Sequence, residues 1–156
     1  MTKNYKIISS FIKDMSSETP DVETFLFVRE NIPKYQLNIS INSKALKKGT
    51  IEVNTTLKFN DKPEILKKSH FEIVYTSIVK VDEKISEKKD MEKIILCDVP
   101  NKIYPTLEKI ILCDVQNQIF PNLERAFLNL LHNSGFPEVK LEKKIDFTEL
   151  YKQRSA

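Results

Sequence analysis

The sequence predicts an α+β fold in which antiparallel strands precede helices. Apolar and polar residues alternate with period two over residues 35–42, 51–59 and 69–81, and short polar turns join these segments. This pattern is typical of an antiparallel meander whose strands each bury one face. An apolar stripe at helical spacing follows near the C-terminus. The chain of 156 residues is of ordinary size for one domain, so a single domain over residues 1–156 is expected.

The third predicted strand has two chemically different faces. Phe71, Ile73 and Tyr75 lie on one face, and His70 and Glu72 lie on the other. The first and second predicted strands alternate in the same way. By contrast, residues 1–34 show no sustained period and are expected to be irregular.

Helix signals are strong after residue 120. Pro121 suits a first helical turn, where its missing N–H would have no partner in any case. Gly135 stands where a C-terminal cap is expected. The apolar stripe between them consists of Leu123, Ala126, Phe127, Leu130 and Leu131. A second, shorter helix is predicted near 147–153 with Asp146 as its N-cap.

A tandem duplication interrupts the domain between the strands and the long helix. Residues 92–107 and 108–123 are identical at twelve of sixteen positions. Two copies are too few for a solenoid. The apolar run IILC is consistent with a buried strand, although periodicity alone does not separate a strand from a helix here. We expect residues 109–114 of the second copy to form the fourth strand, and residues 92–107 to be an added excursion that covers the sheet edge.

The charge balance excludes several classes of partner. Lys and Arg number 25 and Asp and Glu 22, for a net charge of +3, and the two signs are interleaved. Nucleic-acid binding is therefore not predicted, and paired lysines are expected in solvated turns. The sequence shows neither an apolar stretch long enough to span a bilayer nor a signal peptide. A cytoplasmic protein without direct membrane insertion is expected.

The sequence lacks the residue patterns that usually mark a catalytic, metal or cofactor site. Cys97, Cys113, His70 and His132 do not have metal-ligand spacing, and both cysteines are expected to be buried and reduced. Only two glycines occur, which excludes glycine-rich phosphate loops. Accordingly, neither catalysis nor a metal or cofactor is predicted.

Four short segments occur in an order typical of one known family. They are residues 11–20 (FIKDMSSETP), residues 71–75 (FEIVY), a helix framed by IFP at 119–121 and SGFP at 134–137, and residues 145–151 (IDFTELY). In this order they resemble SecB, the bacterial protein-export chaperone family, over residues 8–153. The chain departs from that family in its positive net charge and in the duplication.

The resemblance implies a four-stranded antiparallel sheet packed with two C-terminal helices, assembled as a dimer of dimers. It also implies a chaperone that keeps newly made export proteins unfolded and delivers them to the SecA translocation motor. By position, the motor-binding patch of the family corresponds to Asp14, Glu18 and Glu72, with His70 beside Glu72. Solvated surface carboxylates are the alternative interpretation of the same residues.

The resemblance also implies a client groove lined by apolar and aromatic side chains. The candidates are Phe25, Phe27, Phe71, Ile73, Tyr75 and Tyr151. Phe71 and Ile73 are equally well explained as ordinary core, because the apolar residues of alternating strands are mostly buried. Phe25 and Phe27 are the better groove candidates, since the segment around them is expected to be irregular.

Two other functions remain open at this point. One is an enzyme or a carrier that encloses a small ligand between a helix and the sheet. The other is a SecB paralogue that serves a different partner, such as a toxin–antitoxin system.

Overall fold

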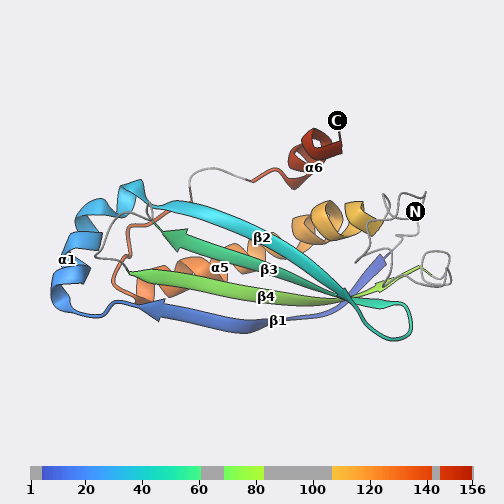
Figure 1. The fold of residues 1–156 in the computed structure, drawn as a ribbon, viewed down its shortest axis with the longest axis horizontal. Coiled ribbons are helices and arrows are strands. Elements are labelled where there is room, and N and C mark those ends of the chain that lie inside the picture. Colours follow the sequence, from blue (N-terminus) through green and yellow to red (C-terminus); the bar gives the residue numbers. More distant parts are fainter. Residues whose placement is uncertain (1–4, 61–68, 83–106, 142–144, 156) are drawn as a thin grey trace.

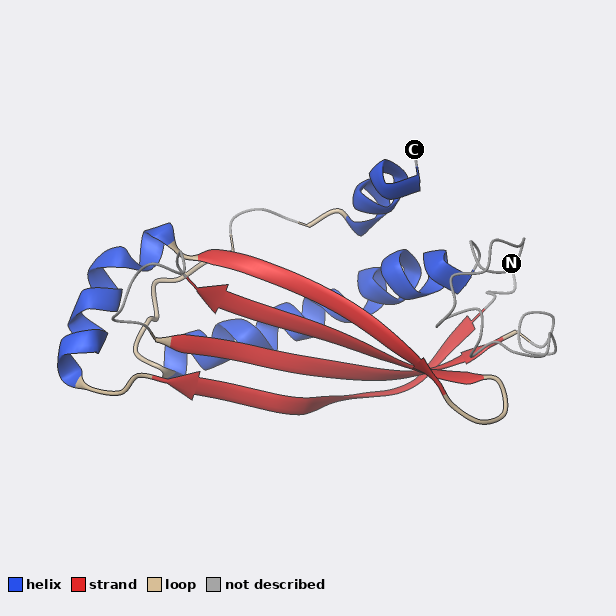
Figure 2. Cartoon of the chain, viewed as in Figure 1, coloured by secondary structure: helices blue, strands red, loops and turns tan. Residues whose placement is uncertain are grey.

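The fold is a four-stranded antiparallel sheet with a long helix covering one face (Figure 1). The structure is a computed structural model, and it describes residues 5–60, 69–82, 107–141 and 145–155. The strands are β1 (Tyr5–Glu18), β2 (Gln36–Ala45), β3 (Thr50–Asn60) and β4 (His70–Val81), in the order β1-β4-β3-β2. The helices are α1 (Val22–Asn31), α5 (Val115–Asn133) and α6 (Phe147–Ser155), with a 3-10 turn over Ile32–Lys34 and a π-helical segment over Ile110–Asp114. Figure 2 shows the strands as a single layer.

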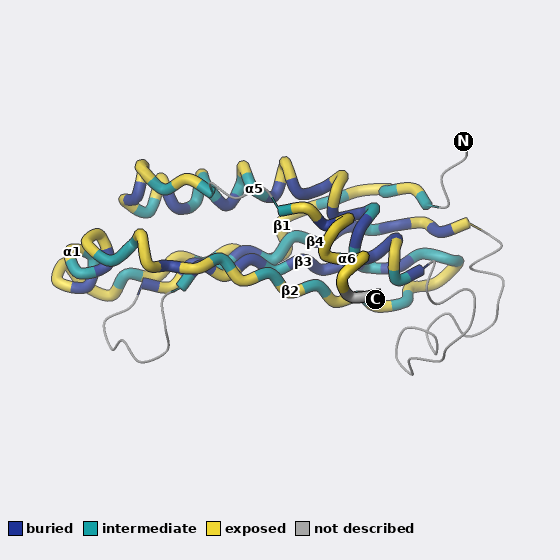
Figure 3. The backbone as a smooth tube through the Cα atoms, turned by 90° about the horizontal axis from the view of Figure 1, so that it is seen from above, coloured by how far each residue is buried: buried dark blue, intermediate teal, exposed yellow. Residues whose placement is uncertain are grey.

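The face of the sheet that packs against α5 is called the inner face, and the opposite face is the outer face. Seen from above, α5 and the sheet form two separate layers (Figure 3). The predicted α+β class and the predicted meander are confirmed, because β2, β3 and β4 are consecutive antiparallel neighbours. Lys48 and Gly49 have φ values of 61° and 72°, and these left-handed residues turn the chain between β2 and β3.

The fourth strand is β1, so the expectation that residues 1–34 are irregular was wrong. β1 pairs with β4 from Tyr5↔Val81 to Glu18↔His70. The register is interrupted between Ile7 and Ser9 and again between Ile12 and Asp14. Each interruption inserts one residue and reverses the faces of the residues that follow, as expected of a β-bulge. The inward positions are therefore 5, 7, 10, 12, 15 and 17, which a strict period-two search does not detect.

Helix α1 occupies the rest of the segment that was expected to be irregular. Asp21 caps it, because the Oδ1 atom of Asp21 accepts a hydrogen bond of 2.7 Å from the backbone N–H of Thr24. Phe25 and Phe27 therefore lie on a helix rather than in a loop. Val28 on the same helix is fully buried, so α1 closes one end of the core.

The expectation of a strand over residues 109–114 was also wrong. Residues 107–133 are helical, and Ile110–Asp114 within them is a π-helical segment. Three of the four residues of the apolar run of the second repeat are buried, namely Ile110, Ile111 and Cys113, but the run is helical because β1 already occupies the place beside β4. The first repeat up to residue 106, including Cys97, lies outside the described residues.

The long helix begins before Pro121 and ends where predicted. Pro121 lies inside α5, on its exposed side, and not in the first turn. At the other end, the N–H of Phe136 donates to the carbonyl of Leu131 at 3.0 Å and that of Gly135 to the carbonyl of His132 at 3.2 Å. These two bonds, with Gly135 at φ 104°, form a Schellman cap. The predicted cap of α6 is confirmed too, since Oδ1 of Asp146 accepts from the N–H of Glu149 at 3.0 Å.

The core follows the length of α5 between the helix and the inner face. Toward α1 it is rich in aromatic residues, and Phe59, Phe71, Phe127 and Phe136 belong to it. Toward the hairpin it is aliphatic, and its members include Ile51, Val53, Val79, Ile110, Val115 and Ile119. A cluster that extends along the whole helix therefore holds the two layers together.

One buried polar side chain joins the layers within this core. Gln116 is fully buried; its Oε1 atom accepts a hydrogen bond of 2.9 Å from Thr55 on β3, and its Nε2 atom donates to the carbonyl of Ile111 at 3.2 Å. The π-helical turn contains that carbonyl. Gln116 therefore couples the irregular start of the helix to the centre of the sheet.

Replacing Gln116 by Leu is expected to destabilise the protein by about 1–3 kcal/mol, because it leaves the Thr55 hydroxyl and the Ile111 carbonyl buried without these partners. Urea unfolding monitored by circular dichroism measures the change. Thr55→Val alone should also destabilise. The double variant Gln116→Leu/Thr55→Val should lose less than the sum of the two single variants, and an additive result would contradict the coupling.

Candidate functional site

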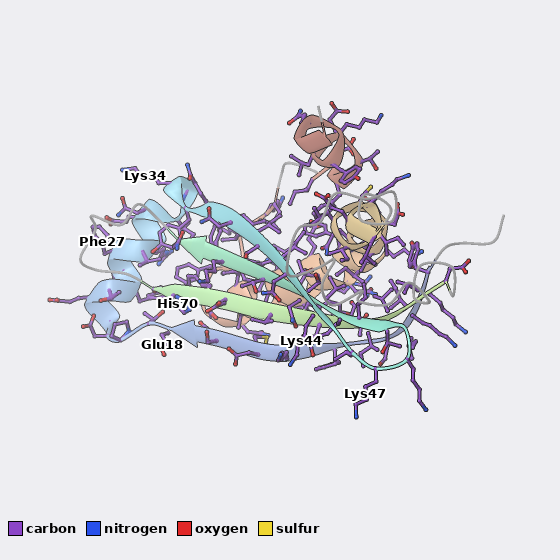
Figure 4. The ribbon with its side chains drawn as sticks, turned by 45° about the vertical axis from the view of Figure 1, so that its right-hand side comes forward. Glu18, Phe27, Lys34, Lys44, Lys47 and His70 are labelled. Carbon is purple, nitrogen blue, oxygen red and sulfur yellow. The ribbon has the colours of Figure 1, made fainter. Side chains whose placement is uncertain are left out.

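The outer face of the β1–β4 pair collects the predicted motor-binding residues. Glu18 is directly opposite His70 in the register, and Glu72 is opposite Ser16. Asp14 occupies the same face, because residues opposite each other in a ladder point to the same side. Figure 4 shows Glu18 and His70 together at the α1 end of these strands. The structure therefore brings all four residues, Asp14, Glu18, His70 and Glu72, onto one surface, the acidic patch.

Charges of both signs meet at the centre of the acidic patch. Oε2 of Glu72 lies 3.2 Å from Nε2 of His70, and Oε1 lies 3.7 Å from Nζ of Lys58. Both basic side chains are about half exposed. Such surface pairs contribute little stability. The patch is therefore open to a partner, and the ammonium group of Lys58 reduces its net charge.

A polar network that sequence analysis did not single out crosses the middle of the outer face. Oγ1 of Thr76 donates to Asn54 at 2.6 Å, and Asn54 donates to Asn42 at 3.1 Å and to Glu52 at 2.8 Å. Lys13 lies 3.5 Å from Glu52. The hydrogen bond from Asn54, with Lys13 nearby, lowers the pKa of Glu52 against the opposing effect of burial. Glu52 is thus held ionised between the two ends of the face.

The predicted client residues have different degrees of burial. Phe71 and Ile73 are fully buried beneath α5, beyond the reach of a bound chain in this conformation. Phe25 and Phe27 on α1 are half-buried. The ring of Phe25 packs against Phe136 with centroids 5.3 Å apart, and it lies so close to Gly135 that a Cβ atom there would come within 2.6 Å of it.

The two tyrosines among the candidates lie on different elements. Tyr75 is half-buried on the inner face of β4, and Tyr151 is half-buried on α6. Sequence analysis treated the apolar residues of β2 as a simple buried face. In the structure Leu37, Ile39 and Ile41 are only half-buried, because β2 is an edge strand. The accessible apolar surface therefore continues from α1 along the β2 edge.

The opposite sheet edge, β1, exposes a larger apolar surface. Ile8, Phe11, Ile12 and Met15 are 44–52 % exposed. They occur on both faces of the strand and at a bulge, so the whole edge is apolar. An edge strand of this kind presents unpaired backbone groups beside apolar side chains, which favours pairing with another chain. The two bulges in β1 interrupt its period-two alternation, so the sequence alone did not reveal this edge strand.

No group of three metal-ligating side chains occurs within the ranges that the structure describes. Cys113 is a buried free thiol, as predicted. Across those same ranges no helix combines the length and the apolar character needed to cross a membrane.

Comparisons with known proteins agree with the geometry. The chain is 68% identical over 155 residues, 99% of both chains, to a protein of Pelagibacter ubique (strain HTCC1062) described as "Putative protein-export protein SecB". It is 24% identical over 103 residues to the protein-export protein SecB of Bartonella quintana (strain Toulouse), covering 65% of this chain and 63% of that protein.

A solved structure shares the fold. It is the Mycobacterium tuberculosis Rv1957 SecB-like chaperone in complex with a ChAD peptide from the Rv1956 HigA1 antitoxin, with a TM-score of 0.58, 10% identity and coverage of 91% of both chains. The family model described as preprotein translocase subunit SecB matches residues 1–123. The chain therefore belongs to the SecB family, a family of protein-export chaperones rather than enzymes.

Proposed function

We propose that this protein holds unfolded precursor proteins in the cytoplasm and passes them to a SecA-type motor ATPase that docks on the acidic patch. The observation that carries the proposal is the convergence of Asp14, Glu18, His70 and Glu72 on the outer face, whereas the half-buried apolar residues of β2 lie on the inner face. A client and the motor can therefore occupy the protein at the same time, as a transfer between them requires.

The client surface is proposed to be the half-buried apolar surface along α1, the β2 edge and α6. Phe27 on α1, Ile39 on β2 and Tyr151 on α6 are partly exposed apolar or aromatic side chains that an unfolded chain can cover. Tyr75, half-buried on the inner face of β4, is the remaining proposed contact and lies apart from these elements. Burial of apolar area favours binding without demanding one client sequence. Phe71 and Ile73 would support this surface from the core, and Phe25 would hold α1 in place.

We propose further that the chain assembles through the β1 edge. Two copies that pair their β1 strands would satisfy the free backbone groups of the edge and cover Ile8, Phe11, Ile12 and Met15 together. Pairing through one edge makes a dimer, and the dimer of dimers implied by the family requires a second contact.

The first prediction tests client holding. The protein should suppress the aggregation of a reduced, unfolded client measured by light scattering, and Phe27→Ala/Tyr151→Ala should weaken client binding roughly tenfold because two aromatic contacts are lost. Val22→Ala, which changes an exposed residue on α1, is the matched control. Absence of suppression by the unaltered protein would refute the holdase assignment.

The second prediction tests the acidic patch. Asp14→Lys/Glu18→Lys/Glu72→Lys should weaken motor binding at least tenfold, most strongly at low ionic strength, with client holding unchanged. The matched control changes three exposed acids elsewhere, namely Glu30→Lys, Glu138→Lys and Glu149→Lys. Titration calorimetry with the purified motor measures both. Equal motor affinity for the patch variant and the control would contradict the assignment.

The third prediction concerns assembly. Light scattering after size exclusion should give a mass that is a multiple of 18.2 kDa. Ile12→Asp/Met15→Asp should lower it, because the charges would be buried in the paired edge. Val22→Asp places a charge on an exposed α1 residue and should leave the mass unchanged. A monomer at micromolar concentration would overturn the proposal.

A further inference from the structure

The two ends of the outer face differ in charge. The acidic patch lies at the α1 end, whereas the end that carries the β2–β3 hairpin is rich in lysine. Figure 4 shows Lys44 and Lys47 at the end opposite Glu18 and His70. The members of this hairpin lysine cluster are Lys6, Lys44, Lys47, Lys48 and Lys80, all of them exposed.

The strand register places these lysines close to one another. Lys6 is directly opposite Lys80 in the β1–β4 ladder. Lys44 lies opposite Glu52 in the β2–β3 ladder, and residues 47–49 form the adjoining turn. Like charges facing each other across a ladder are unfavourable unless an anion lies between them. The arrangement therefore favours an anionic ligand.

Few acids at this end offset the lysines. Among the residues of the described strands and their flanks, Glu52 and Asp82 are the acids near the hairpin. Glu52 already pairs with Lys13 and accepts from Asn54. On the described strands and their flanks, lysines therefore outnumber acids at the hairpin end, although the chain as a whole is nearly neutral.

Exposed apolar side chains among the lysines indicate which kind of anionic partner the cluster suits. Leu46 is 37% exposed between Lys44 and Lys47, and Ile8, at the β1 bulge two residues from Lys6, is 52% exposed. Basic residues that surround exposed apolar side chains are typical of a contact with a lipid surface, where the charges meet headgroups and the apolar groups enter the interface. A single-stranded nucleic acid would instead call for aromatic side chains or arginines, and the cluster contains neither.

We propose that the hairpin lysine cluster binds the headgroups of anionic lipids at a membrane surface, with Leu46 entering the interface. The hairpin turn lies at the end of the sheet away from α1 (Figure 1), so a contact there leaves the acidic patch at the other end free. This contact requires neither a client nor the motor. Its failure would therefore leave the proposed chaperone function untouched.

Sedimentation with vesicles tests the proposal on the purified full chain. Binding is expected to vesicles of phosphatidylcholine mixed with phosphatidylglycerol and not to vesicles of phosphatidylcholine alone. It should weaken as salt rises from about 0.01 M to about 1 M, because screening shortens the reach of the charges. Lys44→Gln/Lys47→Gln/Lys48→Asn should reduce partitioning by roughly 100-fold, since each lysine near an anionic surface contributes about fivefold. Asn is chosen at position 48 because it tolerates the left-handed conformation.

The control variant Lys34→Gln/Lys140→Gln/Lys152→Gln removes the same number of charges from other parts of the surface. It should bind anionic vesicles within about twofold of the unaltered protein, because charges more than a Debye length from the lipid surface are screened. Leu46→Ser should cause a loss that persists at high salt. Equal losses in the two triple variants would overturn the proposal, because they would show a response to net charge alone. Binding to a single-stranded oligonucleotide with no binding to anionic vesicles would overturn it as well.

Discussion

The organisation of this protein depends on one geometric mismatch, which is that a single helix covers a sheet of four strands. An α-helix with its side chains is about 10–12 Å wide, whereas neighbouring strands spaced by about 4.8 Å place the outer two about 14 Å apart. The inner-face residues of β3 and β4 are buried in the core beneath α5, and the end of the helix also reaches β1, where Oγ of Ser134 lies 2.7 Å from Oγ of Ser17. The remaining length of both edges is partly uncovered. The exposure of Ile12 and Met15 on the inner face of β1 and the half-buried apolar residues of β2 follow from this shortfall.

The uncovered edges explain how a small domain can be stable and still offer apolar surface to another chain. The centre is closely tied, since Gln116 links α5 to Thr55 and the aromatic cluster joins Phe59, Phe71 and Phe127. The edges hold apolar side chains that remain available to another chain. A chaperone of the SecB family needs this division, because a client must be bound by surface that does not belong to the chaperone's own core.

The outer face follows a different rule, because no helix covers it. Its side chains are sorted by charge along the strands, with acids near α1, a polar network around Asn54 and lysines at the hairpin. This sorting separates two possible contacts on one face by the length of the sheet. It also explains how a chain with a net charge of +3 still presents an acidic surface.

The sequence by itself determined the elements whose periodicity is regular. The alternation in β2, β3 and β4, the stripe of α5 and the caps at Gly135 and Asp146 were predictable because each depends on nearby residues, and family motifs placed Asp14, Glu18, His70 and Glu72 in one group. Only the tertiary structure decided which segment pairs with β4.

The bulges in β1 hide the alternation of its apolar and polar residues, and the run at 110–113 suits a strand and a helix equally well. Burial of Phe71 but not of Tyr75, although both point inward, depends on where α5 crosses the sheet. That position is set by packing between distant segments, which no local pattern encodes.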